Sequence, residues 1–272
     1  MTDPTPNSAA LNRLRAVRHL ALDLDGTLYC GSRLFDWTRP FLDRLAELGV
    51  GRTFLTNNSS RSRRDYVTKL HGLGIEAEVD DVFPSTLSAV DHIRATYPSV
   101  GRVFVLGTPS LQEELSGEGF EVVDDDPDAV VVGFDTTLVY ERLCRAAWFV
   151  SQGLPFIATH PDRTCPTDQP TVLVDCGAIC AAIALATGRE PEVLGKPHRS
   201  MLSGILARHG LAPHELAMVG DRLYTDMAMA RRAATVGVLV LSGEATVEGL
   251  ADSDESPDVV VEHVGRLGEM LS

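Results

Sequence analysis

LALDLDGT, residues 20–27, is the stretch that decides the fold we expect for this chain. Its first three residues are apolar and predict a buried strand, and Gly26 begins a turn where that strand ends. Asp23 and Asp25 lie two residues apart, so their side chains point to the same face of the strand. Two carboxylates this close repel each other unless a cation lies between them or one of them holds a proton. A metal ion on one and a proton on the other suits phosphoryl transfer, because one carboxylate attacks phosphorus while the other handles the proton of the leaving group.

The composition limits the class of protein. A chain of 272 residues, 44% of them hydrophobic, is long enough for one large domain or two modest ones with substantial cores. Apolar runs such as 129–132 and 236–241 have the length of strands, so we expect no membrane partner. The formal net charge of −14 argues against a nucleic-acid backbone as the main partner. An anionic substrate would need a local attractive field, which a metal ion, a lysine and helix N-termini could supply.

The N-terminus and the cysteines indicate a cytoplasmic protein. Residues 1–10 are polar and contain proline, with no basic region followed by an apolar one, so they do not resemble a secretory signal. We expect residues 1–16 to form a disordered or loosely attached tail. The five cysteines form an odd set without CxxC spacing, which favours reduced thiols. Cys176 and Cys180 are four apart, but no further Cys or His pair has the ligand spacing of a zinc site.

Strand and helix patterns alternate along both ends of the chain, which is typical of an α/β protein. Pro40 lies in the first turn of an expected helix and Gly49 at its end. The sequence therefore predicts a Rossmann-like parallel sheet. Its strands are expected at 19–24, 51–56, 193–194, 216–219 and 236–241, and its helices at 39–49, 61–72, 198–209 and 223–234, with a short strand and a helix within 258–271.

The middle of the chain, residues 84–190, has its own alternation of strands and helices and is large enough for a separate core. We therefore expect residues 17–83 and 191–272 to form one domain, into which a second α/β domain, residues 84–190, is inserted. The inserted domain is expected to contain strands at 103–106, 121–123, 129–134 and 155–159, and helices at 86–96, 139–152 and 177–187, with another short helix between the strands at 103–106 and 121–123.

Polar side chains follow four strands of the predicted sheet. In an open parallel sheet, ligands bind beyond the carboxyl ends of the strands. Each motif alone would be a weak signal, because a DxD pair is common on protein surfaces and an ordinary turn often holds Thr-Asn-Asn. Their shared position at strand ends strengthens the set, which comprises Asp23 and Asp25, Thr56-Asn57-Asn58, Gly195-Lys196-Pro197, and Gly220-Asp221 with Asp226.

The four motifs resemble those of the haloacid dehalogenase-like superfamily, and the resemblance extends from about residue 17 onward. The long insert between the second and third motifs resembles the cap domain of the class IIA branch, the NagD and p-nitrophenylphosphatase type. Residues 54–59 and 218–223 are particularly similar to that branch. The resemblance implies a Rossmann-like core of the HAD fold with an inserted α/β cap that closes over the substrate. It also implies a magnesium-dependent phosphatase.

The resemblance assigns distinct roles to the carboxylates. Asp23 would be the nucleophile that forms an aspartyl-phosphate, and Asp25 would protonate the leaving alkoxide and later take a proton from the hydrolytic water. Mg²⁺ would be held by Asp23, the main-chain carbonyl of Asp25 and the carboxylate of Asp221, since this ion prefers hard oxygen ligands and keeps several waters. Asp226 would orient Asp221 or a metal-bound water.

Phosphate binding is implied for residues of the other two motifs. Lys196 would neutralise the carboxylates and the phosphate together, a task that suits its compact positive charge. Thr56 would donate a hydrogen bond to the phosphoryl oxygens, aided by the main-chain N–H of Asn57. The side chains of Asn57 and Asn58 would fix their loop and contact the substrate.

Two places in the expected cap depart from the pattern of this branch. His160 stands where relatives often have asparagine, and it is either a substrate-facing loop residue or part of a plain connector. Residues 175–178, DCGA, replace a small-residue segment that opens a cap helix, and Asp175 can cap that helix in its place. We expect the loop 160–176 to select the substrate.

These expectations lead to a phosphatase that acts on a small phosphate monoester, such as a sugar phosphate or a nucleotide. Two alternatives stay open. A phosphotransferase or phosphomutase would pass the aspartyl-phosphate to a sugar hydroxyl instead of water, and a non-catalytic binding protein would keep the fold alone. The sequence also leaves a homodimer open and does not identify the substrate.

Overall fold

The computed structural model describes residues 8–165, 167 and 169–271, and the chain divides into two compact units. The first unit comprises the chain up to Leu55, Val67–Phe83 and the chain from Pro197 onward. The second unit comprises Thr56–Tyr66 and Pro84–Lys196. In this division, unlike in the predicted boundaries, residues 56–66 and 191–196 group with the middle of the chain.

Hydrogen bonds and ion pairs account for the grouping of the short segment 56–66. The hydroxyl of Ser59 lies 2.9 Å from that of Thr159, and Arg63 forms ion pairs with Glu114 and Glu118. A pattern of strands and helices carries no information about such long-range contacts. Boundaries drawn where the pattern changes therefore differ from boundaries set by packing.

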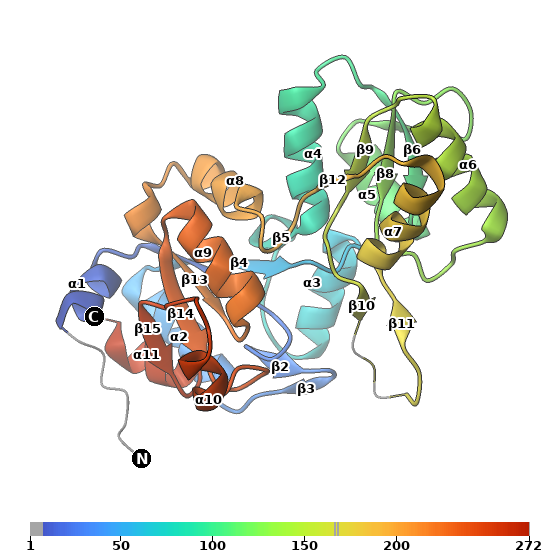
Figure 1. Ribbon diagram of the computed structural model, residues 1–272. Helices are drawn as coiled ribbons and strands as arrows, with labels where there is room; N and C mark the ends of the chain where they lie inside the picture. Colours follow the sequence, from blue (N-terminus) through green and yellow to red (C-terminus); the bar gives the residue numbers. More distant parts are fainter. Residues whose placement is uncertain (1–7, 166, 168, 272) are drawn as a thin grey trace. The chain divides into compact units, whose positions relative to one another are not determined.

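The first unit is built on the six strands β1 (His19–Asp23), β4 (Gly51–Thr56), β5 (Val82–Pro84), β13 (Leu216–Gly220), β14 (Val236–Val240) and β15 (Val259–Val261). They form one sheet in the order β15-β14-β13-β1-β4-β5 (Figure 1). Strand β1 pairs in parallel with both β13 and β4. Leu20, Ala21 and Leu22 are fully buried, as expected for a central strand of a parallel sheet.

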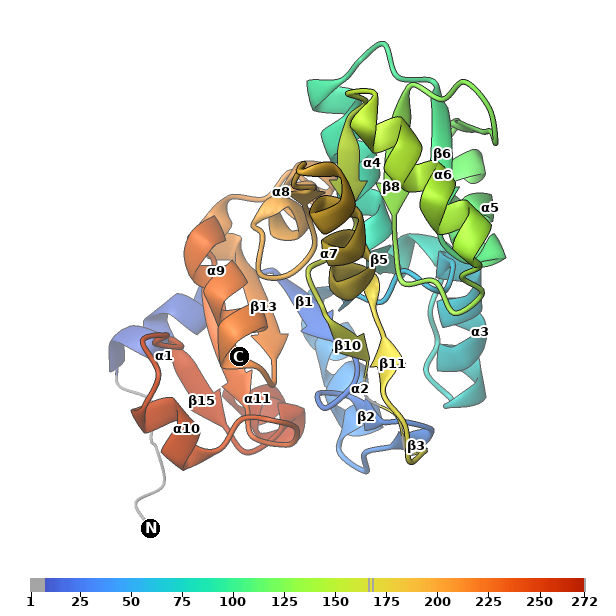
Figure 2. The ribbon, with the colours of Figure 1, turned by 45° about the vertical axis from the view of Figure 1, so that its right-hand side comes forward.

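Helices flank this sheet in contacting pairs. Helix α2 (Thr38–Leu48) contacts α11 (Val264–Met270), and α8 (Ser200–His209) contacts α9 (Ala228–Ala233). The second pair lies side by side in Figures 1 and 2. Helix α2 ends at Gly49, whose φ of 66° suits glycine. The unit also contains α1 (Ser8–Arg15), α10 (Val247–Ala251) and a short hairpin of β2 (Tyr29–Cys30) and β3 (Arg33–Leu34), while α3 (Arg63–Gly72) spans the division between the units.

The N-terminal segment differs in part from the predicted tail. Residues 8–15 form α1, and Leu14 and Val17 are buried. Burial of apolar side chains stabilises a helix that is too short to be stable by itself. Residues 1–7, the rest of the segment for which a tail is predicted, lie outside the described residues.

The second unit is built on the five strands β6 (Arg102–Leu106), β7 (Glu121–Val122), β8 (Ala129–Val132), β9 (Phe156–Ala158) and β12 (Glu192–Val193). They form a parallel sheet in the order β12-β9-β8-β6-β7. Its helices are α4 (Ser85–Thr96), α5 (Pro109–Gly117), α6 (Tyr140–Ser151) and α7 (Cys176–Thr187), of which α6 and α7 lie side by side (Figure 2). A short antiparallel hairpin, β10 (Thr164–Cys165) and β11 (Leu173–Val174), precedes α7.

Alternate residues of these strands pack on opposite faces of the sheet. Val103 and Val105 belong to a cluster that includes residues of α4 and α5, whereas Phe104 and Leu106 belong to a cluster that includes residues of α6 and α7. Side chains two apart share a face of a strand. Because both faces are covered, the strand at 129–132 is apolar throughout.

The predicted fold class is confirmed, since a Rossmann-like parallel sheet is accompanied by a second α/β unit. Most predicted strands and helices agree with the observed ones apart from their ends. The strand predicted at 193–194 for the Rossmann-like sheet is an exception, because it is β12 and pairs with β9 in the sheet of the second unit. Besides α1, several features have no counterpart among the predicted elements, namely strand β5, the hairpin of β2 and β3, the hairpin of β10 and β11, and helix α10. All of them are short, and amphipathic patterns are weak over so few residues.

Candidate active site

Three carboxylates meet at the carboxyl ends of β1 and β13. Asp23 is the last residue of β1, and Asp221 directly follows β13. Leu22 pairs with Val219, which sets the two strand ends side by side. Ligand oxygens of Asp23, Asp221 and Asp226 lie within 4.8 Å of one another. The structure therefore brings together two of the metal ligands that the resemblance implies, Asp23 and Asp221, with Asp226, the residue expected to orient Asp221 or a metal-bound water.

Asp221 lies in surroundings that oppose its negative charge. Its Oδ2 accepts a hydrogen bond from the main-chain N–H of Glu244, at 2.7 Å. Its Oδ1 is buried and accepts no hydrogen bond from any residue that the structure describes. Burial, together with the charges of Asp23 and Asp226, raises the pKa of Asp221 to about 7. A buried carboxylate oxygen without a donor costs free energy, so this atom indicates a place for a cation.

A hard divalent cation such as Mg²⁺ fits this group of side chains. The ion prefers carboxylate and carbonyl oxygens and keeps part of its water shell. Asp23 is only partly buried, so water can reach the site from its side. The three carboxylates repel one another in the absence of positive charge. A bound cation attracts all three and makes the net electrostatic interaction of the group favourable. Both the donor set and the unpartnered Oδ1 of Asp221 therefore suit the ion that the sequence indicates.

Three glycines leave room for these carboxylates. A Cβ atom on Gly26 or Gly243 would lie less than 3.0 Å from the Asp221 carboxylate, and one on Gly220 would lie equally near the Asp226 carboxylate. Gly26 also has a φ of 87°, which residues with a side chain rarely adopt. The turn after β1 therefore requires glycine for two independent reasons.

Gly26→Ala is expected to weaken Mg²⁺ binding by roughly tenfold or more, because the added methyl group displaces the Asp221 carboxylate from the site. Titration calorimetry with MgCl₂ measures this effect, and thermal melts report stability. Gly31→Ala is the matched control, since Gly31 also has a positive φ, of 59°, but a Cβ there would meet no neighbouring atom within 4 Å. Equal Mg²⁺ affinity of the two variants would show that the close approach to Asp221 is unimportant.

Asp226 lies in a turn that differs from the predicted helix. The sequence indicates one regular helix over 223–234, but Leu223–Met227 form a π-helical turn before α9. The carbonyl of Arg222 accepts hydrogen bonds from the main-chain N–H groups of Asp226 and Met227, at 3.1 and 3.2 Å. The buried Asp226 carboxylate in turn accepts one from the N–H of Arg222, at 3.1 Å. Such widened turns are frequent at functional sites, and this one holds Asp226 against the end of β13.

Asp25 has a different environment. The residue is exposed, but its carboxyl group is partly surrounded by protein. This burial raises the pKa of Asp25, Lys69 opposes the change and Asp23 adds to it. The N–H of Gly26 donates to the carbonyl of Tyr29 at 2.8 Å, which fixes the main chain next to Asp25. A raised pKa helps a carboxyl group to hold a proton, as a general acid must.

The second unit holds other predicted site residues in one hydrogen-bonded group. Oδ1 of Asn57 accepts from the main-chain N–H of Lys196, at 2.7 Å. Nδ2 of Asn57 donates to the main-chain carbonyl of Lys196 at 3.1 Å and to Oδ2 of Asp162 at 3.0 Å. Asn57 and Lys196 are both buried. The Asn57 side chain thus fixes the main chain that carries Lys196.

Thr56 and Asn58 shape the loop after β4. The N–H of Asn58 donates to Oγ1 of Thr56 at 3.2 Å, and the Tyr66 hydroxyl lies 3.4 Å from the same atom. Oδ1 of Asn58 accepts from the N–H and the hydroxyl of Ser60, at 2.9 and 2.7 Å. These bonds order the loop, and substrate contact by Asn57 and Asn58 stays a prediction.

The environment of His160 is more specific than the sequence predicts for a substrate-facing loop residue or for a plain connector. Its side chain is completely buried, and Asp162 and Asp175 flank the ring. Asp175 caps α7 as predicted, since its Oδ1 accepts from the N–H of Cys176 at 2.6 Å. Residues 166 and 168 of the predicted specificity loop lie outside the described residues.

Sequence reasoning missed the loop that follows β14. The hydroxyl of Ser242 donates to the main-chain carbonyl of Gly26 at 2.8 Å, and Glu244 supplies the N–H that binds Asp221. The Glu244 carboxylate also pairs with Arg222 at 2.9 Å. A signal was present, because a serine-glycine pair directly follows a further apolar strand at the same edge of the sheet.

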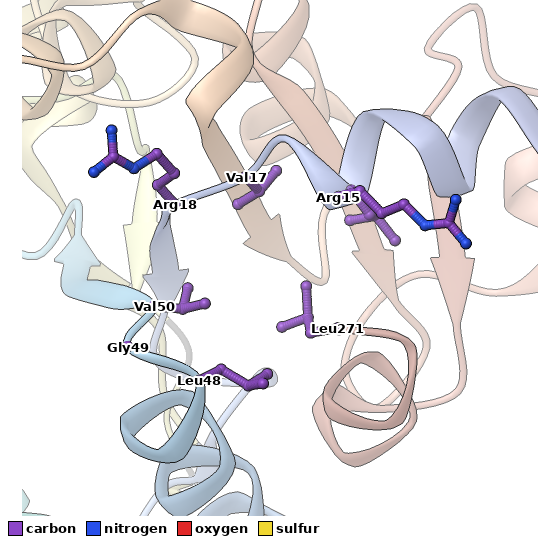
Figure 3. Close-up of a pocket in the computed structure, with 8 residues that line it drawn as sticks. Arg15, Val17, Arg18, Leu48, Gly49, Val50 and Leu271 are labelled. Carbon is purple, nitrogen blue, oxygen red and sulfur yellow. The ribbon is translucent and has the colours of Figure 1, made fainter.

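A pocket of about 220 Å³ lies at the other end of β1 (Figure 3). Val17 and Arg18 precede β1, and Val50 precedes β4, so the pocket is at the amino ends of these strands. Ligands of open parallel sheets bind at the carboxyl ends, so this pocket is separate from the carboxylate site. Its lining consists of Leu14, Arg15, Val17, Arg18, Leu48, Gly49, Val50 and Leu271.

Two further predictions can be compared with the structure. None of the helices in the described part of the chain combines the length and the apolar character that a membrane crossing requires. All five cysteines lie in the described part and are free, with 4.0 Å between the sulfurs of Cys176 and Cys180. The free cysteines agree with the predicted reduced thiols.

Family models match both ends of the chain. A model described as haloacid dehalogenase-like hydrolase matches residues 20–121, and a second one, for HAD-like hydrolases, matches residues 193–267. The first match contains Asp23, Asp25 and the residues 56–58, and the second contains the remaining site residues, Lys196, Asp221 and Asp226.

Several proteins similar to this chain are named as phosphatases. The chain is 32% identical to the acid sugar phosphatase of Staphylococcus epidermidis, over 87% of this chain and 91% of that protein. It is similar in structure to a 4-nitrophenylphosphatase from Thermotoga maritima, with a TM-score of 0.90, 38% identity and coverage of 94% and 98% of the two chains. A glycerol phosphate phosphatase from Mycobacterium tuberculosis, in complex with magnesium, gives a TM-score of 0.86, 30% identity and coverage of 96% and 80%.

Proposed function

Because this chain belongs to the haloacid dehalogenase-like hydrolases, in their class IIA branch of NagD and 4-nitrophenylphosphatase type, we propose that it hydrolyses a small phosphate monoester through an aspartyl-phosphate on Asp23. The chain is a hydrolase of phosphoric monoesters, since its named relatives are phosphatases. The observation that carries the proposed mechanism is the buried Oδ1 of Asp221, which lacks a donor among the described residues and lies beside two further carboxylates.

The proposed cofactor is Mg²⁺, held by Asp23, the main-chain carbonyl of Asp25 and the carboxylate of Asp221. When bound, the ion supplies the positive charge that allows an anionic carboxylate to approach an anionic phosphate. Asp226 is proposed to orient Asp221, a role that its burial beside Asp221 supports. The related phosphatase from Mycobacterium tuberculosis has been crystallised with magnesium.

The proposed reaction has two steps that use the same pair of aspartates. In the first step an Asp23 oxygen attacks phosphorus, the bond to the ester oxygen breaks, and Asp25 gives its proton to the departing alkoxide. In the second step Asp25 takes a proton from water, the water oxygen attacks the phosphorus of the aspartyl-phosphate, and Asp23 is regenerated as phosphate leaves. The raised pKa of Asp25 supports its role as the acid of the first step.

Thr56 and Lys196 are proposed to bind the phosphoryl oxygens. The lysine supplies a compact positive charge, and the threonine a hydroxyl donor. The side-chain bonds of Asn57 and Asn58 support a role in ordering the loops around them. Phosphate contact in this loop is proposed for the Thr56 hydroxyl and the main-chain N–H of Asn57, and substrate contact by the side chains of Asn57 and Asn58 stays a prediction.

The proposed substrate is a small phosphorylated metabolite such as a sugar phosphate or a nucleotide. The names of the relatives, which include an acid sugar phosphatase and a glycerol phosphate phosphatase, support this class of ester. We propose that the loop 160–176 selects among these esters. The free cysteines support a cytoplasmic location for the reaction.

A screen of phosphate release tests the proposal. Sugar phosphates, nucleoside monophosphates, glycerol phosphate and pyridoxal phosphate are each incubated with the protein, once with Mg²⁺ and once with a chelator. Mg²⁺-dependent release of phosphate from a sugar phosphate, without an isomerised product, supports hydrolysis and excludes a phosphomutase. Absence of turnover on every ester would favour the non-catalytic alternative.

Asp25→Asn is expected to lower kcat by about 10²- to 10⁴-fold, because the amide neither gives nor takes a proton in the two steps. Mg²⁺ affinity should change little, since the variant keeps the main-chain carbonyl that is proposed to hold the ion. Steady-state kinetics and calorimetric titration with MgCl₂ measure the two quantities. A variant that no longer binds Mg²⁺ would contradict this division of roles within Asp25.

A further inference from the structure

His160 lies completely buried between two carboxylates of the second unit. Its Nδ1 is 3.3 Å from Oδ2 of Asp162, and its Nε2 is 3.5 Å from Oδ1 of Asp175. Neither ring nitrogen makes a well-directed hydrogen bond to another described residue. A neutral imidazole has only one N–H and can donate to one carboxylate, whereas an imidazolium donates from both nitrogens. The flanking carboxylates therefore favour the charged ring.

The charged groups around the ring support this assignment. Burial alone would lower the pKa of His160, but Cys176, Asp162 and Asp175 together raise it to about 9. Burial likewise opposes the ionisation of Asp162, yet His160, Asn57 and Lys196 hold the pKa of Asp162 below its ordinary value. His160 thus faces ionisable groups of its own loop and of the start of α7.

A metal ion is the main alternative occupant, because the three side chains could supply one ligand each. However, Nδ1 faces one carboxylate and Nε2 faces the other, and one ion cannot contact both ring nitrogens. The carboxylate oxygens nearest the ring also accept hydrogen bonds already. Oδ2 of Asp162 accepts from Asn57, and Oδ1 of Asp175 accepts from the N–H of Cys176. The geometry therefore favours an ion triad over a metal site.

This triad is connected to the main chain of Lys196. Oδ2 of Asp162, the atom that faces His160, accepts a hydrogen bond from Nδ2 of Asn57. Asn57 in turn bonds the N–H and the carbonyl of Lys196, at 2.7 and 3.1 Å. The side chains of His160, Asp162 and Asn57 therefore form a continuous series of contacts that ends at the main chain of Lys196.

Close packing at two glycines fixes the relative positions of the Lys196 loop, the His160 loop and the first turn of α7. A Cβ on Gly195 would lie 2.8 Å from Cβ of His160, so the residue before Lys196 rests directly on the histidine. A Cβ on Gly177 would lie less than 3.0 Å from the carbonyl oxygen of Pro161, and the N–H of Gly177 donates to the carbonyl of Asp162 at 2.8 Å. The Lys196 loop, the His160 loop and the first turn of α7 therefore form one packed group.

We propose that His160 is a positioning residue for Lys196, acting as a buried imidazolium through Asp162 and Asn57. The inference rests on the proposed function, in which Lys196 binds phosphate. It differs from both sequence interpretations of His160, because the ring is completely buried between two carboxylates. His160 sets the position of the charge that binds the substrate without contacting the substrate itself.

The test compares His160→Gln, Asp162→Asn and the double variant in the full-length protein. Each single substitution is expected to raise the inhibition constant of inorganic phosphate, and the KM of an ester, by roughly tenfold to a hundredfold, because a displaced binding group loses much of its effect. The double variant should lose no more than either single variant, since one connected group is broken in each case. His92→Gln is the matched control, because His92 of the same unit also pairs with a carboxylate, that of Glu192 at 2.6 Å, and should change neither constant.

The pH dependence supplies a readout that a merely structural role would not change. Phosphate affinity of the wild type should fall as the pH rises toward about 9, where His160 loses its second proton, and this fall should be absent in His160→Gln. ¹⁵N NMR of histidine-labelled wild type keeps the proposal testable even where a variant does not fold. At about pH 8, one of the eight histidines should have both ring nitrogens protonated.

Three results would overturn the inference. One is an unchanged inhibition constant in folded His160→Gln, another is additive losses in the double variant, and the third is a stoichiometric metal ion in the purified protein that His160→Gln lacks. A wild-type protein that neither hydrolyses esters nor binds inorganic phosphate would instead remove the proposed function, and this inference with it. Measurements on the wild-type protein therefore distinguish failure of the proposed function from failure of this inference alone.

Discussion

Asp23→Asn is expected to abolish turnover while leaving the protein folded. The amide has the shape of the carboxylate but lacks the anionic oxygen that attacks phosphorus, and loss of a catalytic nucleophile typically lowers kcat by roughly 10⁴-fold or more. The fold should survive because the substitution removes one of three mutually repelling carboxylates and creates no cavity. Phosphate release measures turnover, and circular dichroism with a thermal melt shows whether the variant is folded.

Trapping of the aspartyl-phosphate tests directly whether Asp23 is the nucleophile. A ³²P-labelled ester mixed with wild type and quenched in acid should leave label on the protein, and hydroxylamine should release it, as expected for an acyl phosphate. Asp23→Asn should carry no label. Asp43→Asn is the matched control, because Asp43 is an exposed carboxylate on α2 of the same unit and should leave labelling and turnover unchanged. Substantial turnover by Asp23→Asn would show that another group attacks phosphorus.

The sequence predicts the carboxylate group well because its main features are local. Asp23 and Asp221 each follow an apolar strand, and parallel strands place their carboxyl ends at one edge of a sheet. The partner of Asp221 could not be found in this way. Glu244 binds it through a main-chain N–H, which every residue except proline possesses, so residue type gives no signal. The π-helical turn around Asp226 likewise depends on hydrogen-bond geometry, which helical spacing does not encode.

The arrangement around His160 shows a second limit of structure prediction from the sequence. Its partners come from three separate segments, and Asn57 bonds the main chain of Lys196 across 139 positions of sequence. Hydrophobic periodicity predicts which face of an element is buried, but it does not predict which buried polar groups meet there. The local position of Asp175 predicts a helix cap, and that part is confirmed. Its contact with the His160 ring depends on the tertiary fold.

Asp221→Asn is expected to stabilise the metal-free protein and to remove its response to Mg²⁺. The wild-type carboxylate is buried beside Asp23 and Asp226, and its Oδ1 has no donor among the described residues. A neutral amide relieves the repulsion and can donate to a neighbouring carboxylate. A gain of about 1 kcal/mol corresponds to a rise in Tm of roughly 2–4 °C for a protein of this size.

The pH dependence of the metal-free protein should reveal the same group. The pKa of Asp221 is raised from 3.8 to about 7 on folding, so the folded state binds a proton that the unfolded state has already lost between these values. Its contribution to stability is therefore greatest at low pH and is lost as the pH rises through about 7. Melts with a chelator between about pH 5 and pH 8 should show this decline in wild type, and Asp221→Asn should show less of it.

Addition of Mg²⁺ should make wild type more stable than Asp221→Asn, the reverse of the order expected without metal. A ligand present at 100 times its Kd stabilises the folded state by about 2.7 kcal/mol, so the Tm of wild type should rise with MgCl₂. Asp221→Asn lacks a charged ligand and should respond little, which makes it the more stable protein with chelator and the less stable one with Mg²⁺. Asp43→Asn should follow wild type under both conditions, since Asp43 is exposed on α2. A Tm of Asp221→Asn that rises with MgCl₂ as much as that of wild type would place the ion elsewhere and would remove the physical basis for the reaction at Asp23.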